Sequence, residues 1–197
     1  MLAVENITKR FGEQTVLSGV SFVFPEGAVT ALRGASGCGK TTLVHIILGL
    51  LEPDAGRVVG REGTRMAAVF QEDRLIESFN AARNVRLTTP REVSDARIAE
   101  ALRAVGIDPR DDKRVSQFSG GMRRRVAIVR AALFGANVVL LDEPFKGLDE
   151  GARQAAIDLL RATCPGATMI LVSHDREDVA RMGASAQLWL RQEGGET

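Results

Sequence analysis

The sequence has few cysteines and almost no net charge. Among its 197 residues there are two cysteines, Cys38 and Cys164, which lie far apart in the chain. Two isolated cysteines exclude a small disulfide-stapled scaffold and indicate reduced thiols in a cytosolic protein. Lys and Arg number 26 against 25 Asp and Glu, which gives a net charge of +1. Because nucleic-acid binders usually have a strongly basic face, we expect no nucleic-acid partner.

Long apolar runs are also missing. The longest, LVHIILGLL at 43–51, contains a histidine and is far shorter than the roughly 20 residues that cross a bilayer. The N-terminus lacks the basic and then apolar build of a signal peptide. We therefore expect a chain that is soluble, or that is held at a membrane by a partner. The length suits one domain with a substantial core, and the tail at 191–197 is expected to fray.

The hydrophobic pattern alternates between short strands and helices. Apolar and β-branched runs predict strands at 20–24, 28–33, 65–70, 137–142 and 168–173. Helical patterns predict helices at 40–50 and 150–163, and Pro, Asp and Gly predict a turn at 52–56. The run 137–142 is apolar until its final acid, as expected of a strand buried on both faces. Because a helix joins it to 168–173, these two strands predict a parallel sheet.

The middle of the chain has a different character. From about residue 73 to residue 133 there is no convincing strand, and SDARIAEALRAVGI at 94–107 has helical spacing with Ser94 as a cap. We therefore predict a mostly helical subdomain at 73–133, inserted into an α/β core formed by 1–72 and 134–197.

The segment GASGCGKT, residues 34–41, matches the pattern G-x-x-x-x-G-K-[ST] between a predicted strand and a predicted helix. Glycines let backbone N–H groups converge on phosphate oxygens, and the helix N-terminus adds partial positive charge. Lys40 is expected to reach the β and γ phosphates of a nucleotide, and Thr41 to bind Mg²⁺. The loop residues expected at the nucleotide are Gly34, Ala35, Ser36, Gly37, Cys38, Gly39, Lys40, Thr41 and Thr42.

A second acidic motif, VVLLDEP, lies at residues 138–144. An acid at the end of a buried strand needs a partner, and Asp142 has one if it holds Mg²⁺ through water. Glu143 then lies beside the γ-phosphate, where it can orient and deprotonate the attacking water. Alone, this segment would indicate only a strand that ends in a charged loop. The phosphate loop upstream favours the catalytic interpretation.

The remaining motifs separate the classes of phosphate-loop protein. The Asn-Lys-x-Asp motif of GTPases is absent, and small-molecule kinases usually lack an Asp-Glu pair after the second strand. Instead FSGGM, at 118–122, precedes that pair by about twenty residues. This order resembles the ATP-binding cassette (ABC) family, over nearly the whole chain from about residue 4 to 190. The resemblance implies an α/β fold: a phosphate-loop (RecA-like) core with a mainly parallel sheet, N-terminal antiparallel strands and an inserted helical subdomain with the signature.

The resemblance also implies further residues at the nucleotide. Phe11 takes the place of the aromatic residue that stacks on adenine, and Val16 is also expected to bind the nucleotide. The family usually has tyrosine there, and this sequence contains none, which implies looser base selectivity. Gln71, in VFQEDRL, matches the glutamine that contacts Mg²⁺ and the attacking water. His174, in LVSHD, matches the switch histidine that contacts the γ-phosphate. The implied catalytic residues are Lys40, Gln71, Glu143 and His174, and the implied metal ligands are Thr41, Gln71 and Asp142.

The signature implies a second subunit. In this family two cassettes face each other head to tail, and each ATP lies between the phosphate loop of one and the signature of the other. The residues expected to act in trans are Ser119, Gly120, Gly121 and Asp149, the last in KGLDE. We therefore expect a homodimer, or a heterodimer with a related chain.

Two features of FSGGMRRRVAI depart from a simple phosphate site. Met122 replaces the usual glutamine of the signature, but the groups that would touch phosphate remain, so we expect activity to survive. Arg123, Arg124 and Arg125 follow at about 100° per residue around a helix, so they do not form one stripe. We expect them to be solvated or to form local ion pairs.

The function implied by the resemblance is ATP hydrolysis that drives transport by a membrane permease. The permease would dock near residues 71–85, and this stretch is weakly similar to importers of small oxyanions such as nitrate, sulfonate or taurine. An importer would also need a substrate-binding protein. Alternatives are an exporter subunit or a soluble cassette protein of DNA repair or translation. We expect a cytoplasmic protein, peripheral on the inner face of the cell membrane, with no C-terminal regulatory domain.

Overall fold

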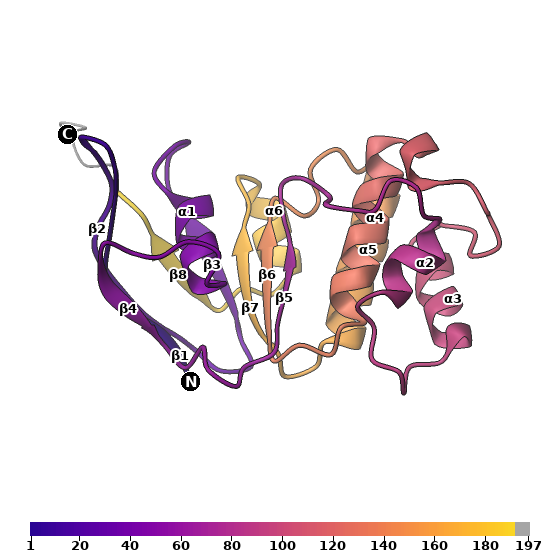
Figure 1. Cartoon of the computed structure of the whole chain (residues 1–197), viewed down its shortest axis with the longest axis horizontal. Helices are drawn as coiled ribbons and strands as arrows, with labels where there is room; N and C mark the ends of the chain where they lie inside the picture. The colour runs from indigo at the N-terminus through magenta and orange to yellow at the C-terminus, as the bar shows by residue number, and fades with distance from the viewer. Residues whose placement is uncertain (192–197) are drawn as a thin grey trace.

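The chain folds into two β-sheets with helices between and beyond them (Figure 1). The computed structural model describes residues 1–191, so the predicted fraying at 191–197 lies, except for its first residue, outside the described residues. The strands are β1 (Leu2–Phe11), β2 (Gln14–Phe24), β3 (Val29–Arg33), β4 (Ala55–Val59), β5 (Met66–Val69), β6 (Val138–Asp142), β7 (Thr168–Val172) and β8 (Ala186–Trp189). The helices are α1 (Lys40–Ile47), α2 (Ala81–Arg86), α3 (Asp95–Ala104), α4 (Gly120–Ala132), α5 (Glu150–Thr163) and α6 (Arg176–Arg181), with a 3₁₀ turn, η1, at Val115–Gln117.

The larger sheet is parallel and carries the site. Its order is β5-β6-β7-β3-β8, and every neighbouring pair in it is parallel. The smaller sheet, β2-β1-β4, is antiparallel and is formed by the N-terminal part of the chain. The predicted strand 20–24 is the end of the longer β2, because the β1–β2 hairpin begins at Gln14. The parallel sheet expected from the 137–173 segment is confirmed.

Strand β6 lies at the centre of the fold and is buried along its full length. Its side chains alternate between two hydrophobic clusters, since successive residues of a strand face opposite sides. Val138 and Leu140 belong to the cluster that contains α1 and the antiparallel sheet. Val139 and Leu141 belong to the cluster that contains α4 and α5. This two-sided burial explains why the sequence there is an unbroken apolar run.

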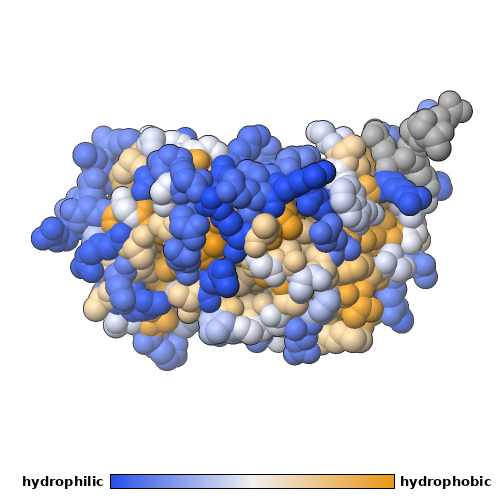
Figure 2. Space-filling view, turned by 180° about the vertical axis from the view of Figure 1, so that it is seen from behind, coloured by the Kyte–Doolittle hydropathy of each residue, from blue (hydrophilic) through white to orange (hydrophobic). Residues whose placement is uncertain are grey.

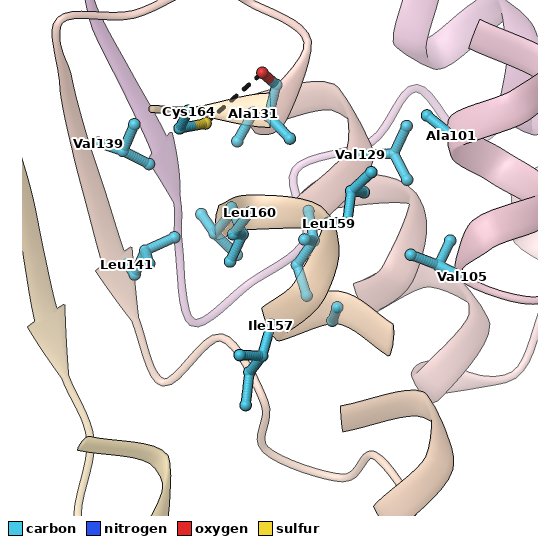
Figure 3. Packing of buried hydrophobic residues seen from close by; sticks show 14 of the residues in the cluster. Ala101, Val105, Val129, Ala131, Val139, Leu141, Ile157, Leu159, Leu160 and Cys164 are labelled. Atoms are coloured by element: carbon cyan, nitrogen blue, oxygen red, sulfur yellow. Dashed lines mark hydrogen bonds between the residues drawn. The ribbon is translucent and has the colours of Figure 1, made fainter. Parts of the chain in front are cut away.

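Helix α5 links the parallel sheet to the more distant helices. In Figure 3 its residues Ile157 and Leu160 lie beside Leu141 of β6, and α4 and α3 lie on its other side. The thiol of Cys164, at the end of α5, donates to the carbonyl oxygen of Ala132 at 3.7 Å. Both cysteines of the chain are free and buried, as the sequence predicts. The helices between residues 73 and 133 therefore connect to the strands mainly through α4 and α5 (Figure 1).

Capping residues place the helix ends close to their predicted positions. Ser94 accepts a hydrogen bond from the backbone N–H of Arg97, so α3 begins where its cap predicts. Helix α1 ends at Ile47, three residues earlier than predicted. Gly49 adopts a φ of 72°, and the N–H of Leu50 donates back to the carbonyl of His45, which closes the helix. The sequence pattern predicted a longer helix because apolar residues continue after Ile47.

The surface is mixed in polarity. Seen from behind, hydrophilic residues gather along the upper part of the molecule, and apolar residues are more frequent below it (Figure 2). Among residues 1–191, no helix is both long and apolar enough to cross a membrane. Within residues 73–133 the structure contains α2, α3, η1 and α4 and no strand. The division of the chain into a core and a helical subdomain remains a prediction.

Candidate nucleotide site

A cavity of about 740 Å³ lies where the parallel strands end. The loops that follow β3, β5, β6 and β7 all contribute to it, as expected for ligand sites at the carboxyl edge of a parallel sheet. Residues separated by up to 164 positions, from Gln14 to Asp178, therefore meet in one place. The predicted site residues in its lining are Val16, Ser36, Gly37, Gly39, Lys40, Thr41, Thr42, Gln71, Asp142, Glu143 and His174.

The phosphate loop is held in a tight turn between β3 and α1. The Nζ of Lys40 donates to the carbonyl oxygens of Gly34 at 3.0 Å and Ala35 at 2.7 Å, so the loop folds around the ammonium group. Gly34 has a φ of 146°, and a Cβ there would lie 2.5 Å from both the Sγ of Cys38 and the carbonyl oxygen of Leu190. Gly34, Ala35 and Cys38 thus shape the loop from outside the cavity lining, and Lys40 lies inside it.

Two oxygen donors for a cation come together at the start of α1. The hydroxyl of Thr41 donates to Oδ2 of Asp142 at 2.8 Å, although the two residues are 101 positions apart. Asp142 is 2% exposed, and Gln71 lines the same cavity. Hydroxyl, carboxylate and amide oxygens are the hard ligands that Mg²⁺ prefers. Within residues 1–191 no group of three or more His, Cys, Asp or Glu is arranged to hold a metal ion.

Glu143 is held in an unusual position directly after β6. Its φ is 50°, a left-handed conformation that is unfavourable for a residue other than glycine and that is often found at functional sites. Its Oε1 is buried, accepts no hydrogen bond, and lies 3.5 Å from Nε2 of His174. Burial raises the pKa of the Glu143 carboxyl, and the positive charge of a protonated His174 opposes this rise. A carboxylate whose proton affinity is increased in this way is suited to accept a proton from water.

The loop that carries His174 is supported by residues that the sequence motifs did not reveal. The hydroxyl of Ser173 donates to Oδ2 of the buried Asp178 at 2.8 Å. Nη1 of Arg153, from α5, donates to Oδ2 of Asp175 at 2.8 Å and lies 3.4 Å from Oδ1 of Asp178. All four residues line the cavity. Their partners lie on different elements, so no local spacing in the sequence could have identified them.

Several predicted site residues lie outside the cavity. Ser119, Gly120 and Asp149 are exposed, and the signature and Asp149 contribute nothing to the lining. Ser119 caps α4 by accepting from the N–H of Met122 at 3.2 Å, and Asp149 caps α5 through the N–H of Ala152. Phe11 is 51% exposed at the end of β1, where it is paired in register with Gln14, which does line the cavity. Gly121 lies in the first turn of α4.

Local ion pairs were expected for the three arginines after the signature, and Arg123 and Arg124 both form one with Asp73, at 3.7 and 3.2 Å. The alternative, solvated side chains, is wrong, because none of the three arginines is exposed. Arg124 is buried, and its guanidinium donates to the backbone carbonyls of Phe70 and Gln71. Arg123 and Arg125 are half-buried, and they donate to the carbonyls of Phe118 and Val105 respectively. Because carbonyl acceptors are available on every element, charge spacing in the sequence could not predict these contacts.

Together these features define a class of protein. A glycine-rich loop between β3 and α1 encloses Lys40, and the acidic pair Asp142–Glu143 lies at the end of β6 in the same parallel sheet. This is the site of a phosphate-loop nucleoside triphosphatase.

Comparison with known proteins identifies the family. Residues 17–146 match the family model described as ABC transporter. The chain is 41% identical over 196 aligned residues to a Halobacterium salinarum protein named as an ABC transporter ATP-binding protein, in a match that covers 91% of this chain and 84% of that one. It is 38% identical over 214 aligned residues to a Fe(3+) ions import ATP-binding protein, FbpC 1, of Rhodococcus jostii. That match covers 95% of this chain and 61% of the import protein, so the chain spans less than two thirds of that relative.

A solved structure agrees with this assignment. The fold matches a dimeric ATP-binding cassette in a post-hydrolysis state with ADP and Pi, with a TM-score of 0.84 and 26% identity. The match covers 97% of this chain and 94% of that one. The chain therefore belongs to the ABC transporter family and is an ATP-binding ATPase cassette. The α/β phosphate-loop fold and the family resemblance predicted from the motifs are both confirmed.

Proposed function

We propose that the chain is the ATPase subunit of an importer for a small solute, and that it acts as a head-to-tail dimer. The observation that carries this proposal is the division of the predicted site. The phosphate loop, Asp142, Glu143 and His174 share one cavity, whereas Ser119 is exposed outside it. This separation supports a composite site in which one chain supplies the two halves from separate surfaces.

Within one half, each residue has a distinct task in hydrolysis. The ammonium group of Lys40 neutralises charge that develops on the phosphate oxygens. Glu143 orients the attacking water and accepts its proton, and His174, whose Nε2 lies 3.5 Å from Oε1 of Glu143, contacts the γ-phosphate. Thr41, Gln71 and Asp142 would hold Mg²⁺, which supplies further electrophilic stabilisation of the phosphoryl group when bound. The reaction is the transfer of the γ-phosphoryl group to water.

The second half of each site comes from the partner subunit in this proposal. The Ser119 oxygen accepts the capping hydrogen bond, so its O–H proton remains free to donate. An exposed donor beside the N-terminus of the 13-residue α4 suits a phosphate oxygen of the partner's ATP. A Cβ added at Gly120 would meet no atom within 4 Å, and one added at Gly121 would lie 3.5 Å from its nearest neighbour, so a nucleotide could approach the backbone there. ATP binding would favour the closed dimer, and hydrolysis would allow it to reopen.

The importer assignment rests on relatives and on one surface. The Rhodococcus relative named above is an import ATP-binding protein. Near the predicted permease-docking segment at 71–85, Ile76 and Leu87 are 44% and 55% exposed. Exposed large apolar side chains of this kind suit a membrane subunit's cytoplasmic segment. The chain would then lie on the inner face of the membrane, and the solute would be selected by the permease and a substrate-binding protein.

The composite site can be tested by mixing two inactive chains. Lys40→Ala removes the phosphate contact of one chain. Ser119→Asp preserves the helix cap, because Asp is also a strong N-cap, but places a negative charge against the partner's γ-phosphate. A mixed dimer would contain one intact site, and random mixing should restore roughly a quarter of wild-type activity.

The control for the second variant is Ser94→Asp, which makes the same change at the cap of α3, away from the cavity. It should keep wild-type activity. An inactive mixture, with both chains folded and able to dimerise, would argue that the site is complete within one chain.

A further inference from the structure

Two arginines of α4 hold the segment that carries Gln71. Nη1 and Nη2 of Arg124 donate to the carbonyl oxygens of Phe70 and Gln71, and its Nε lies 3.2 Å from Oδ1 of Asp73. Arg124 is 8% exposed. A planar guanidinium can bridge two neighbouring carbonyls in this way, whereas the point charge of a lysine cannot.

The second arginine continues the same contact along the segment. Nη1 of Arg130 donates to the carbonyl oxygen of Arg74 at 2.7 Å, and Nη2 donates to that of Asp73 at 3.0 Å. Four carbonyls, those of residues 70, 71, 73 and 74, therefore bind to one helix. Burial of a charged group is unfavourable unless it is well hydrogen-bonded, so this arrangement depends on these backbone partners.

The segment itself is held in one conformation. Arg74 has a φ of 46°, which is unfavourable for a non-glycine residue, and its guanidinium lies 3.7 Å from the ring centroid of Phe70. The side chain of Asp73 is 17% exposed and lies between Arg124 and Arg123. Nε of Arg123 is the more distant, at 3.7 Å from Oδ2 of Asp73. The backbone is thus held on both sides of Gln71, whose exposed side chain lines the cavity.

We propose that Arg124 and Arg130 are positioning residues for Gln71, which they hold at the nucleotide by tying residues 70–74 to helix α4. The inference rests on the proposed role of Gln71 in hydrolysis. Ser119 caps the N-terminus of the same helix, five residues or about 8 Å along its axis from Arg124. A movement of the signature on meeting the partner's ATP would therefore shift Gln71 in the chain's own site. This contact links the two nucleotide sites of the dimer.

The test is the steady-state ATPase activity of full-length variants, corrected for the folded fraction. Arg124→Ala should lower kcat by about tenfold or more, because small misplacements of a catalytic group have large effects. The KM for ATP should change less than about twofold, since the phosphate loop is unaltered. Arg130→Ala should act in the same direction, and Arg124→Lys should recover part of the loss. The matched control, Arg86→Ala, removes an arginine of α2 that likewise donates to backbone carbonyls, those of Pro90 and Val93, but does not line the cavity, so its kcat should stay near wild type.

A double-mutant cycle with Gln71→Ala decides how Arg124 acts. If Arg124 works through Gln71, adding Arg124→Ala to Gln71→Ala should cause little further loss of kcat. Full multiplication of the two effects would overturn the inference while leaving the proposed function intact. Equal losses for Arg124→Ala and Arg86→Ala would do the same. A wild-type kcat for Gln71→Ala alone would instead refute the proposed role of Gln71, and the inference with it.

Discussion

Replacing Glu143 with glutamine should lower the rate of ATP hydrolysis and raise the stability of the fold. Glutamine keeps the size of the side chain but can neither carry the charge nor accept the proton from water. Loss of a general base lowers rates by about 10²- to 10⁴-fold, so we expect hydrolysis to fall by that factor. ATP should still bind, because Lys40 and Thr41 are unchanged. A dimer that closes on ATP should then accumulate.

The magnitude of the stability change follows from the surroundings of Glu143. Its side chain is 17% exposed, and Oε1 is buried without a hydrogen-bond donor. An unsatisfied buried group of this kind costs about 1–3 kcal/mol, and more when it is charged. Glutamine removes the charge and leaves a neutral amide, so we expect a gain of about 1 kcal/mol. In a chain of this length that corresponds to a rise in Tm of about 2–4 °C.

The stability gained by Glu143→Gln should increase as the pH rises. Burial raises the pKa of Glu143 in the folded state above the unfolded value near 4.5. Between the two values the folded state binds more protons than the unfolded state, so the free energy of unfolding falls as pH rises through this window. The protonated carboxyl therefore contributes its full stability below pH 4.5, and this contribution is lost above the folded-state pKa. Glutamine has no such dependence, so its advantage should appear at neutral pH and disappear near pH 4.5.

Three assays check this prediction. Phosphate release measures hydrolysis, size-exclusion chromatography with ATP measures dimer formation, and thermal unfolding across pH measures stability. Glu150→Gln is the control, because Glu150 is an exposed glutamate of α5 that pairs with Arg181. Wild-type hydrolysis by Glu143→Gln would refute its role as the base. A Tm at neutral pH equal to or below that of the wild type would refute the argument from burial.

Three further predictions concern the loop, the base and the histidine segment. Gly34→Ala should lower both Tm and ATP affinity, because the added Cβ would lie 2.5 Å from Cys38 Sγ. The control Gly120→Ala has open space around it and should keep the wild-type Tm, so equal losses of Tm in the two variants would count against this account of the loop. Phe11→Ala should change stability by less than about 0.5 kcal/mol because the side chain is exposed. If the ring stacks on adenine, however, it should weaken ATP binding by about 1–3 kcal/mol in a titration, and unchanged affinity would exclude the stack. Ser173→Ala leaves the buried Asp178 without its hydroxyl donor and should lower the free energy of unfolding by about 1–3 kcal/mol in a denaturant titration. An unchanged free energy of unfolding would mean that Arg153 alone satisfies the Asp178 carboxylate.

The phosphate loop and the acidic pair could be predicted because their chemistry is local. A glycine-rich turn followed by Lys40 and Thr41 needs only a strand before it and a helix after it, and both are visible as hydrophobic patterns. The caps at Ser94 and Ser119 were predictable for the same reason, since a cap is formed within three residues. The end of α1 was misjudged because apolar residues continue beyond Gly49, where the backbone turns out of the helix.

Contacts between distant elements could not be predicted in this way. Thr41 meets Asp142 across 101 residues, and Arg124 reaches the carbonyls of Phe70 and Gln71 across more than fifty. The left-handed backbone of Glu143 and the position of Arg153 beside the histidine loop also depend on how the sheet and α5 pack. Local pattern therefore predicted which residues bind and hydrolyse a nucleotide. Packing decided how they are held, because backbone carbonyls and buried charges find their partners only when distant segments come together.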